Sequence, residues 1–102
     1  MHYHGVMISK ETIADFCRRH RIRRLSLYGS ILREDFGAES DVDVLVEFET
    51  GKVPSLLGMA GLEIELSEML GRRVDLRTPE DLSRYFRNEV VGAAVLQYAL
   101  ET

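Results

Sequence analysis

The chain has 102 residues, enough for one compact domain and too few for two, and no repeat, linker or low-complexity tract divides it. Its net charge of −4 argues against a protein that coats nucleic acid, and its single cysteine, Cys17, excludes an internal disulfide and fits a reducing cytoplasm. No apolar run approaches the ~20 residues of a membrane span, and the N-terminus lacks the apolar core of a signal peptide. We therefore expect one cytoplasmic domain over residues 1–102.

The first predicted element is a helix that Ser9 can cap and that ends near His20. Its apolar positions (Ile13, Phe16 and Cys17) follow helical spacing. A dense basic run overlaps its end, formed by Arg18, Arg19, Arg21, Arg23 and Arg24. Cations are favourable at the C-terminus of a helix, and we prefer this explanation of the run. Contact with RNA or with an acidic partner is the alternative.

The next segment predicts two strands joined through a turn. Leu25 and Leu27 alternate with Ser26 and Tyr28, which predicts a short strand that runs into a turn at Gly29-Ser30. A short helix over 31–36 and a loop over 37–40 follow. Alternation of apolar and polar residues then predicts a half-buried strand over 42–48.

A long helix is predicted next. Leucines and methionines recur at helical spacing from Leu56 to Leu70, and Gly71 can end the helix. We interpret this stripe as core.

The last part of the chain predicts a third strand and a further helix. In the strand over 72–77, Asp75 lies on the face opposite its apolar neighbours. The run 78–81, Thr-Pro-Glu-Asp, is typical of a helix start, and helical spacing continues to Leu100 with a break near Asn88. We therefore expect an α/β fold, a single small mixed sheet with helices packed on it.

One motif carries the chemistry. Gly29-Ser30 is followed, after ten intervening residues, by Asp41-Val42-Asp43. Because successive side chains on a strand point to opposite faces, Asp41 and Asp43 share one face, where their charges repel each other. Such a pair persists most easily when a divalent cation takes up the charge.

Asp75 extends this pair to three carboxylates, which suit Mg²⁺ shared with substrate phosphates. Gly29 lets the backbone approach a phosphate closely, and the Ser30 hydroxyl can bind it. Arg33 can reach a phosphate oxygen or pair with a carboxylate. Each residue also has a purely structural interpretation. Asp75 could be an ion-paired surface residue among arginines, and Arg33 could be a structural partner of Glu34 or Asp35.

These residues resemble the nucleotidyltransferase superfamily that includes DNA polymerase β, whose signature is Gly-Ser, then Asp-x-Asp, then a distal third carboxylate. The closer resemblance is to the minimal nucleotidyltransferases, the MntA-like antitoxins. It rests on Gly29, Ser30, Asp41 and Asp43, and on the segments LREDF, ESDVDVLVEFE, LGRRVDLRTPEDLSRYFR and VLQYA. It covers nearly the whole chain. Glu39 stands where many relatives carry proline, which alters the loop and not the ligands.

The resemblance implies a polymerase β-type nucleotidyltransferase core and transfer of AMP from ATP to a tyrosine hydroxyl of a HEPN-domain (HepT-like) toxin, which silences the toxin. It implies two Mg²⁺ ions held by Asp41, Asp43 and Asp75, with Asp75 assisting deprotonation of the acceptor, and a hetero-oligomer with the toxin. Adenine preference rests on the resemblance alone.

Two other functions stay open. The chain could be a non-catalytic antitoxin that blocks its toxin by binding, although a pure binder needs none of the five motif residues. It could also be a nucleotidyltransferase that modifies a small molecule, although only 25 residues follow Arg77 and no separate acceptor domain is visible.

Overall fold

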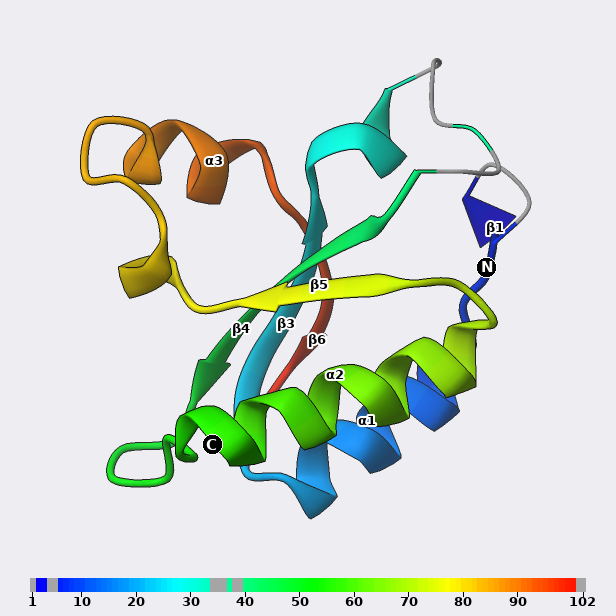
Figure 1. Ribbon diagram of the computed structural model, residues 1–102, viewed down its shortest axis with the longest axis vertical. Helices are drawn as coiled ribbons and strands as arrows, with labels where there is room; N and C mark the ends of the chain where they lie inside the picture. Colours follow the sequence, from blue (N-terminus) through cyan, green and yellow to red (C-terminus); the bar gives the residue numbers. More distant parts are fainter. Residues whose placement is uncertain (1, 4–5, 34–36, 38–39, 101–102) are drawn as a thin grey trace.

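The computed structural model describes residues 2–3, 6–33, 37 and 40–100. Its centre is a four-stranded sheet in the order β5-β4-β3-β6 (Figure 1). The strands are β3 (Ile22–Tyr28), β4 (Val42–Phe48), β5 (Val74–Arg77) and β6 (Val95–Ala99). β4 runs parallel to β5, and β3 runs antiparallel to both of its neighbours. The mixed sheet confirms the predicted fold class.

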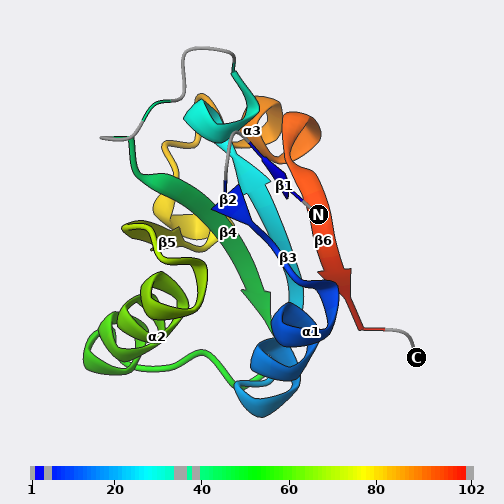
Figure 2. The ribbon, with the colours of Figure 1, turned by 90° about the vertical axis from the view of Figure 1, so that its right-hand side faces the viewer.

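Two helices pack on one face of this sheet (Figure 2). They are α1 (Lys10–Arg19) and α2 (Leu56–Leu70). Their buried side chains interdigitate with the valines and leucines of β3, β4 and β5 in one core, in which Cys17 is fully buried. At the N-terminus, β1 (His2–Tyr3) and β2 (Val6–Met7) form a separate antiparallel pair. No helix in the described part of the chain is long and apolar enough to span a membrane.

The ends of both helices are as predicted. The Ser9 hydroxyl caps α1 by accepting a hydrogen bond from the Thr12 N–H at 3.3 Å, and the helix ends at His20. Gly71 ends α2 in the left-handed conformation, with φ of 65°. The α2 stripe is only in part core, because Leu62 and Leu66 are buried whereas Leu56 is 91% exposed.

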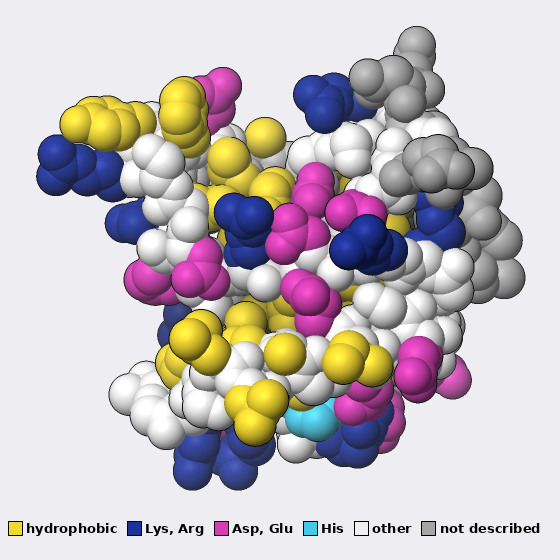
Figure 3. Space-filling view, in the orientation of Figure 1, with side chains coloured by type: hydrophobic (Ala, Val, Ile, Leu, Met, Phe, Trp, Pro, Cys, Tyr) yellow, Lys and Arg dark blue, Asp and Glu magenta, His cyan; other side chains and the backbone are white. Residues whose placement is uncertain are grey.

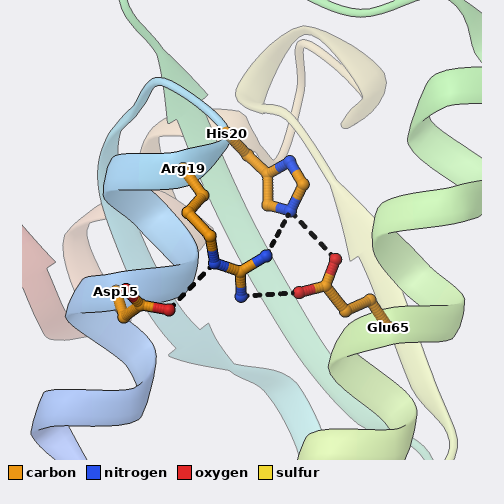
Figure 4. Close-up of polar contacts among 4 residues, drawn as sticks. All are labelled: Asp15, Arg19, His20 and Glu65. Atoms are coloured by element: carbon orange, nitrogen blue, oxygen red, sulfur yellow. Dashed lines mark hydrogen bonds and ion pairs between the residues drawn. The ribbon is translucent and has the colours of Figure 1, made fainter.

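A polar cluster joins the two helices at their outer surface (Figure 4). Glu65 of α2 accepts hydrogen bonds from the Arg19 guanidinium at 2.7 Å and contacts the His20 ring nitrogen at 2.9 Å. Asp15 holds the same guanidinium from within α1, at 2.8 Å. These contacts fix how α1 lies against α2, and so they position both helices under the sheet.

α2 also covers the outer edge of β5. The Glu63 carboxylate accepts a hydrogen bond from the Leu76 N–H at 2.8 Å, and the Ser67 hydroxyl accepts one from the Val74 N–H at 3.0 Å. Both N–H groups belong to the edge that no strand pairs. The side chains of α2 therefore take the place of a further strand.

The C-terminal prediction is correct for the capped start at Thr78 and for helix over 87–93, but wrong for the residues after them. The capped start forms only a short 3₁₀-helix, η2 (Pro79–Asp81), and Asn88 lies inside α3 (Arg87–Ala93) instead of at a break. Residues 95–99 form a strand, because this segment supplies the antiparallel partner that β3 lacks on its second edge. The Leu100 N–H continues this pairing with a hydrogen bond to the Arg23 carbonyl at 2.8 Å. Tertiary pairing here overrides the helical spacing.

Two further predictions need correction. Gly29–Leu32 form a 3₁₀-helix, η1, and Arg33 is already extended, whereas residues 34–36 of the predicted helix lie outside the described residues. The basic run is not confined to a helix end, because Arg23 and Arg24 lie in β3, where they pair with Glu47 of β4. Arg21 turns the chain between helix and strand with φ of 59°.

Candidate active site

Three side chains form a row across the sheet, on the face opposite α1 and α2. Asp43 of β4 pairs in register with Tyr28 of β3 on one side and with Asp75 of β5 on the other. Residues in register on neighbouring strands point to the same face. The predicted carboxylates Asp43 and Asp75 are therefore brought together by the parallel pairing of β4 and β5. Figure 3 shows acidic side chains gathered over the middle of the molecule, between basic ones.

Asp43 is the most perturbed carboxylate of this row. Partial burial raises its pKa most, a hydrogen bond from the Ser30 backbone opposes this rise, and the charges of Asp75 and Asp41 raise the pKa further. The ionised form is thus held in an unfavourable environment. A cation or a positive substrate group would relieve it, which is typical of a functional site.

Gly29 is required by its contact with Asp43. It has φ of +71°, and a Cβ at this position would overlap the Asp43 carboxylate oxygen. The turn also fixes the neighbouring residues, since the Ser30 hydroxyl donates to the Asp41 carbonyl at 3.3 Å and the Arg33 N–H donates to the Ser30 carbonyl at 3.0 Å. The Gly-Ser turn and both acids of the Asp-x-Asp motif therefore form one packed unit.

Asp75 has a second partner. Its carboxylate accepts a hydrogen bond from the Arg77 guanidinium at 3.2 Å, so the ion-paired state considered from the sequence is present. Within residues 2–3, 6–33, 37 and 40–100, no group of three or more His, Cys, Asp or Glu side chains is arranged to hold a metal ion.

The donor set nevertheless suits Mg²⁺ in its chemistry. Asp41, Asp43 and Asp75 supply only hard carboxylate oxygens, and Asp43 feels the charges of both other acids. Asp75 would have to exchange Arg77 for the ion.

Sequence reasoning missed Tyr28. Its ring is about half buried beside the acids, and burial raises its pKa to about 12, with further contributions from Asp43 and Asp75. Alternation along the strand could have placed it on this face, but the register that sets it opposite Asp43 could not be read from the chain.

A hollow of about 650 Å³ adjoins the turn. It lies between η1 and α3, and its wall is mostly apolar, with two charged residues, Arg33 just after η1 and Glu89 of α3. The full lining consists of Tyr28, Gly29, Leu32, Arg33, Phe86, Glu89, Val90 and Ala93. Because α3 was predicted as part of a longer helix, this hollow was not foreseen.

Comparison with known proteins agrees with this geometry. The family model described as "Nucleotidyltransferase domain" matches residues 9–96. A candidate protein adenylyltransferase of Methanocaldococcus jannaschii is 36% identical over 86 residues, which are 84% of this chain and 90% of that protein. The protein adenylyltransferase MntA of Thermococcus cleftensis is 45% identical over 58 residues, 57% of each chain.

Solved structures share the fold. A toxin–antitoxin structure with AMP-PNP superposes with a TM-score of 0.73 at 19% identity, covering 92% of this chain and 76% of that one. A complex of a tri-AMPylated HEPN toxin of Shewanella oneidensis with an MNT antitoxin gives a TM-score of 0.65 at 19% identity, over 89% and 70%. The family model matches most of this chain, and the chain covers 90% of the Methanocaldococcus jannaschii relative. This chain therefore belongs to the nucleotidyltransferase domain family, among the minimal, MntA-like members.

Proposed function

We propose that this protein is a Mg²⁺-dependent antitoxin that transfers AMP from ATP to a tyrosine hydroxyl of a HEPN-domain toxin. The observation that carries the proposal is the contact of Gly29 with Asp43, which lies beside Asp75 in the parallel register of β4 and β5. The named relatives support it: one is a protein adenylyltransferase, and one fold neighbour is an MNT antitoxin bound to an AMPylated toxin.

The nucleotide would bind at the Gly-Ser turn. Gly29 allows close approach of a phosphate, and the Ser30 hydroxyl and the Arg33 guanidinium are the donors nearest to this turn in the chain. The hollow between η1 and α3 adjoins Gly29 and has room for the nucleoside part of the donor.

The acids would hold the metal and manage the acceptor proton. Asp41, Asp43 and Asp75 are the ligands that we assign to Mg²⁺, which, when bound, supplies positive charge to the phosphates. A tyrosine hydroxyl has a pKa near ~10, so a base is needed at neutral pH. We assign the role of base to Asp75, whose carboxylate is paired with Arg77 in this structure.

In the transfer of AMP, one bond to phosphorus forms and one breaks. The acceptor oxygen forms a bond to the α-phosphorus of ATP, the bond from that phosphorus to the bridging oxygen breaks, and pyrophosphate leaves with the bonding electrons. The phenolic proton passes to a carboxylate and then to water. Arg77 lies beside the acids, and its guanidinium can offset the negative charge of the leaving pyrophosphate.

The test mixes this protein with a HEPN-domain toxin, ATP and Mg²⁺, and weighs the toxin by mass spectrometry. We expect a gain of one or more AMP units, lost in the Asp41→Ala/Asp43→Ala variant. Glu47→Gln is the matched control, because Glu47 lies on the same strand and face but pairs with Arg23 and Arg24.

The same experiment separates the second candidate. Neutralisation of the toxin by the double alanine variant, without any mass gain, would mean that the protein blocks its partner by binding alone. The ion pair of Asp75 with Arg77 is the observation that favours this non-catalytic candidate, because Asp75 is occupied by a protein partner.

A further inference from the structure

α2 exposes an apolar surface that the fold does not use. Leu56, Leu57 and Ile64 of α2 are 91%, 84% and 61% exposed, and Val53, which precedes the helix, is 66% exposed. We call these four side chains the α2 patch. On its inner side the same helix buries Leu62 and Leu66. A helix that is apolar on both sides is typical of one that lies between two bodies, of which only the sheet belongs to this chain.

One short contact ties α2, which carries most of the patch, to the strand that carries Asp75. Ile64 follows Glu63, whose carboxylate binds the Leu76 N–H at 2.8 Å, and Leu76 follows Asp75. α2 is therefore fixed at the outer edge of β5, and Asp75 lies in the same strand. Figure 3 shows hydrophobic side chains gathered along α2, directly beside the acidic group in the same view.

We propose that the α2 patch is the docking surface for the protein that accepts AMP. This inference rests on the proposed function and adds where its partner binds. The partner would present an apolar surface next to its acceptor tyrosine, whose hydroxyl would lie beside Asp43 and Asp75.

The size of the molecule supports this occupant. A stable protein interface covers about 800 Å² on each partner, equivalent to a disc of roughly 16 Å radius. The molecule measures 37 × 32 Å in the plane of Figure 3. An interface of this size that is centred on the acids in this view extends over the α2 patch. A small-molecule acceptor would leave the patch exposed.

The test compares Leu57→Ser/Ile64→Ser with Leu96→Ser. Leu96 is the matched control, an exposed leucine (45%) on β6, at the opposite edge of the sheet from β5. The probe is the same HEPN-domain toxin, and its affinity is measured by calorimetry without nucleotide. We expect the double variant to raise Kd at least about tenfold and the control to leave it within about twofold.

Kinetics separate docking from chemistry. With saturating HEPN protein the double variant should reach the wild-type kcat for AMP transfer, with KM raised in proportion to Kd, and its melting temperature and AMP-PNP binding should be unchanged.

Equal affinities of wild type and double variant would overturn the inference even if AMP is transferred. So would absence of any binding by the wild type, or self-association of the wild type that the double variant abolishes. Loss of AMP transfer with the patch effect intact would overturn only the proposed function.

Discussion

Asp43 and Asp75 lie side by side on parallel strands, and Asp43 is the one whose ionised form the fold disfavours. Because the pKa of Asp43 is raised in the folded state, its protonated carboxyl group contributes stability below the ordinary pKa of 3.8. This contribution is lost as the pH rises through the pKa of Asp43 in the folded state. At neutral pH the charged Asp43 therefore destabilises the fold. This cost agrees with the proposed role of Asp43 in the active site.

Asp43→Asn should accordingly stabilise the protein at pH 7 while abolishing AMP transfer. The amide oxygen can still accept the hydrogen bond from the Ser30 backbone, and the repulsion from Asp41 and Asp75 is gone. The expected gain is about 0.5 kcal/mol, or about 2–4 °C in Tm for a domain of this size. Calorimetry at pH 7 and pH 3 measures it, and the gain should vanish at pH 3. A lower Tm at pH 7 would contradict this account of the site.

Gly29→Ala should be more harmful than Gly51→Ala. Both glycines have positive φ, +71° and +76°, but a Cβ at Gly51 meets only open space. We expect a loss of about 1 kcal/mol at Gly51, from the left-handed backbone alone, and about 2–3 kcal/mol at Gly29. Urea denaturation gives both values.

A double-mutant cycle then assigns the excess at Gly29 to its contact. In an Asp43→Ala background the carboxylate that overlaps the new Cβ is absent, so Gly29→Ala should cost no more than Gly51→Ala does. An unchanged difference between the two glycines would show that another feature of the turn demands glycine.

Glu63→Ala should loosen the outer edge of β5. It leaves the Leu76 N–H without its acceptor, which typically costs about 1–2 kcal/mol. Glu63→Gln keeps an oxygen acceptor and should cost less than half of this. Hydrogen exchange of the Leu76 amide reports the change directly, with the Leu45 amide in the centre of the sheet as the internal reference. Equal protection in both variants would mean that α2 does not protect this edge.

Glu65 should make the protein acid-sensitive. Hydrogen bonds from Arg19 and His20, with Arg19 the larger influence, hold its pKa below the ordinary 4.5. A lowered folded pKa contributes stability that is fully present above about pH 4.5 and is lost as the pH falls through the lowered value. Because the pair is partly exposed, we expect a contribution of about 0.5–1 kcal/mol.

Glu65→Gln tests this contribution. Its free energy of unfolding should lie below that of the wild type at pH 7, and the two should converge as the pH falls through the lowered pKa of Glu65. Asp15→Asn is the control, because Asp15 contacts only Arg19 of this cluster and is 63% exposed, so its effect should be smaller. A constant difference across the pH range would rule out ionisation of Glu65 as the cause.

The sequence determined those parts of the protein that depend on local rules. Ser9 and Gly71 end helices through contacts within a few residues, and the alternation over 42–48 produces the strand that carries Asp43. The spacing of Gly29-Ser30 to Asp41 and Asp43, with the segments around it, was sufficient to predict the family, because the motif residues stand at fixed places in the chain.

Only the tertiary structure decided which distant residues meet. The register of β4 with β5 places Asp75 beside Asp43, and pairing with β3 turns residues 95–99 into a strand in spite of their helical spacing. The same assembly leaves Leu56 outside the core, although it belongs to the predicted stripe in which Leu62 and Leu66 are buried. Strand pairing and helix docking depend on contacts between segments far apart in the chain, and the local pattern of a single segment does not contain this information.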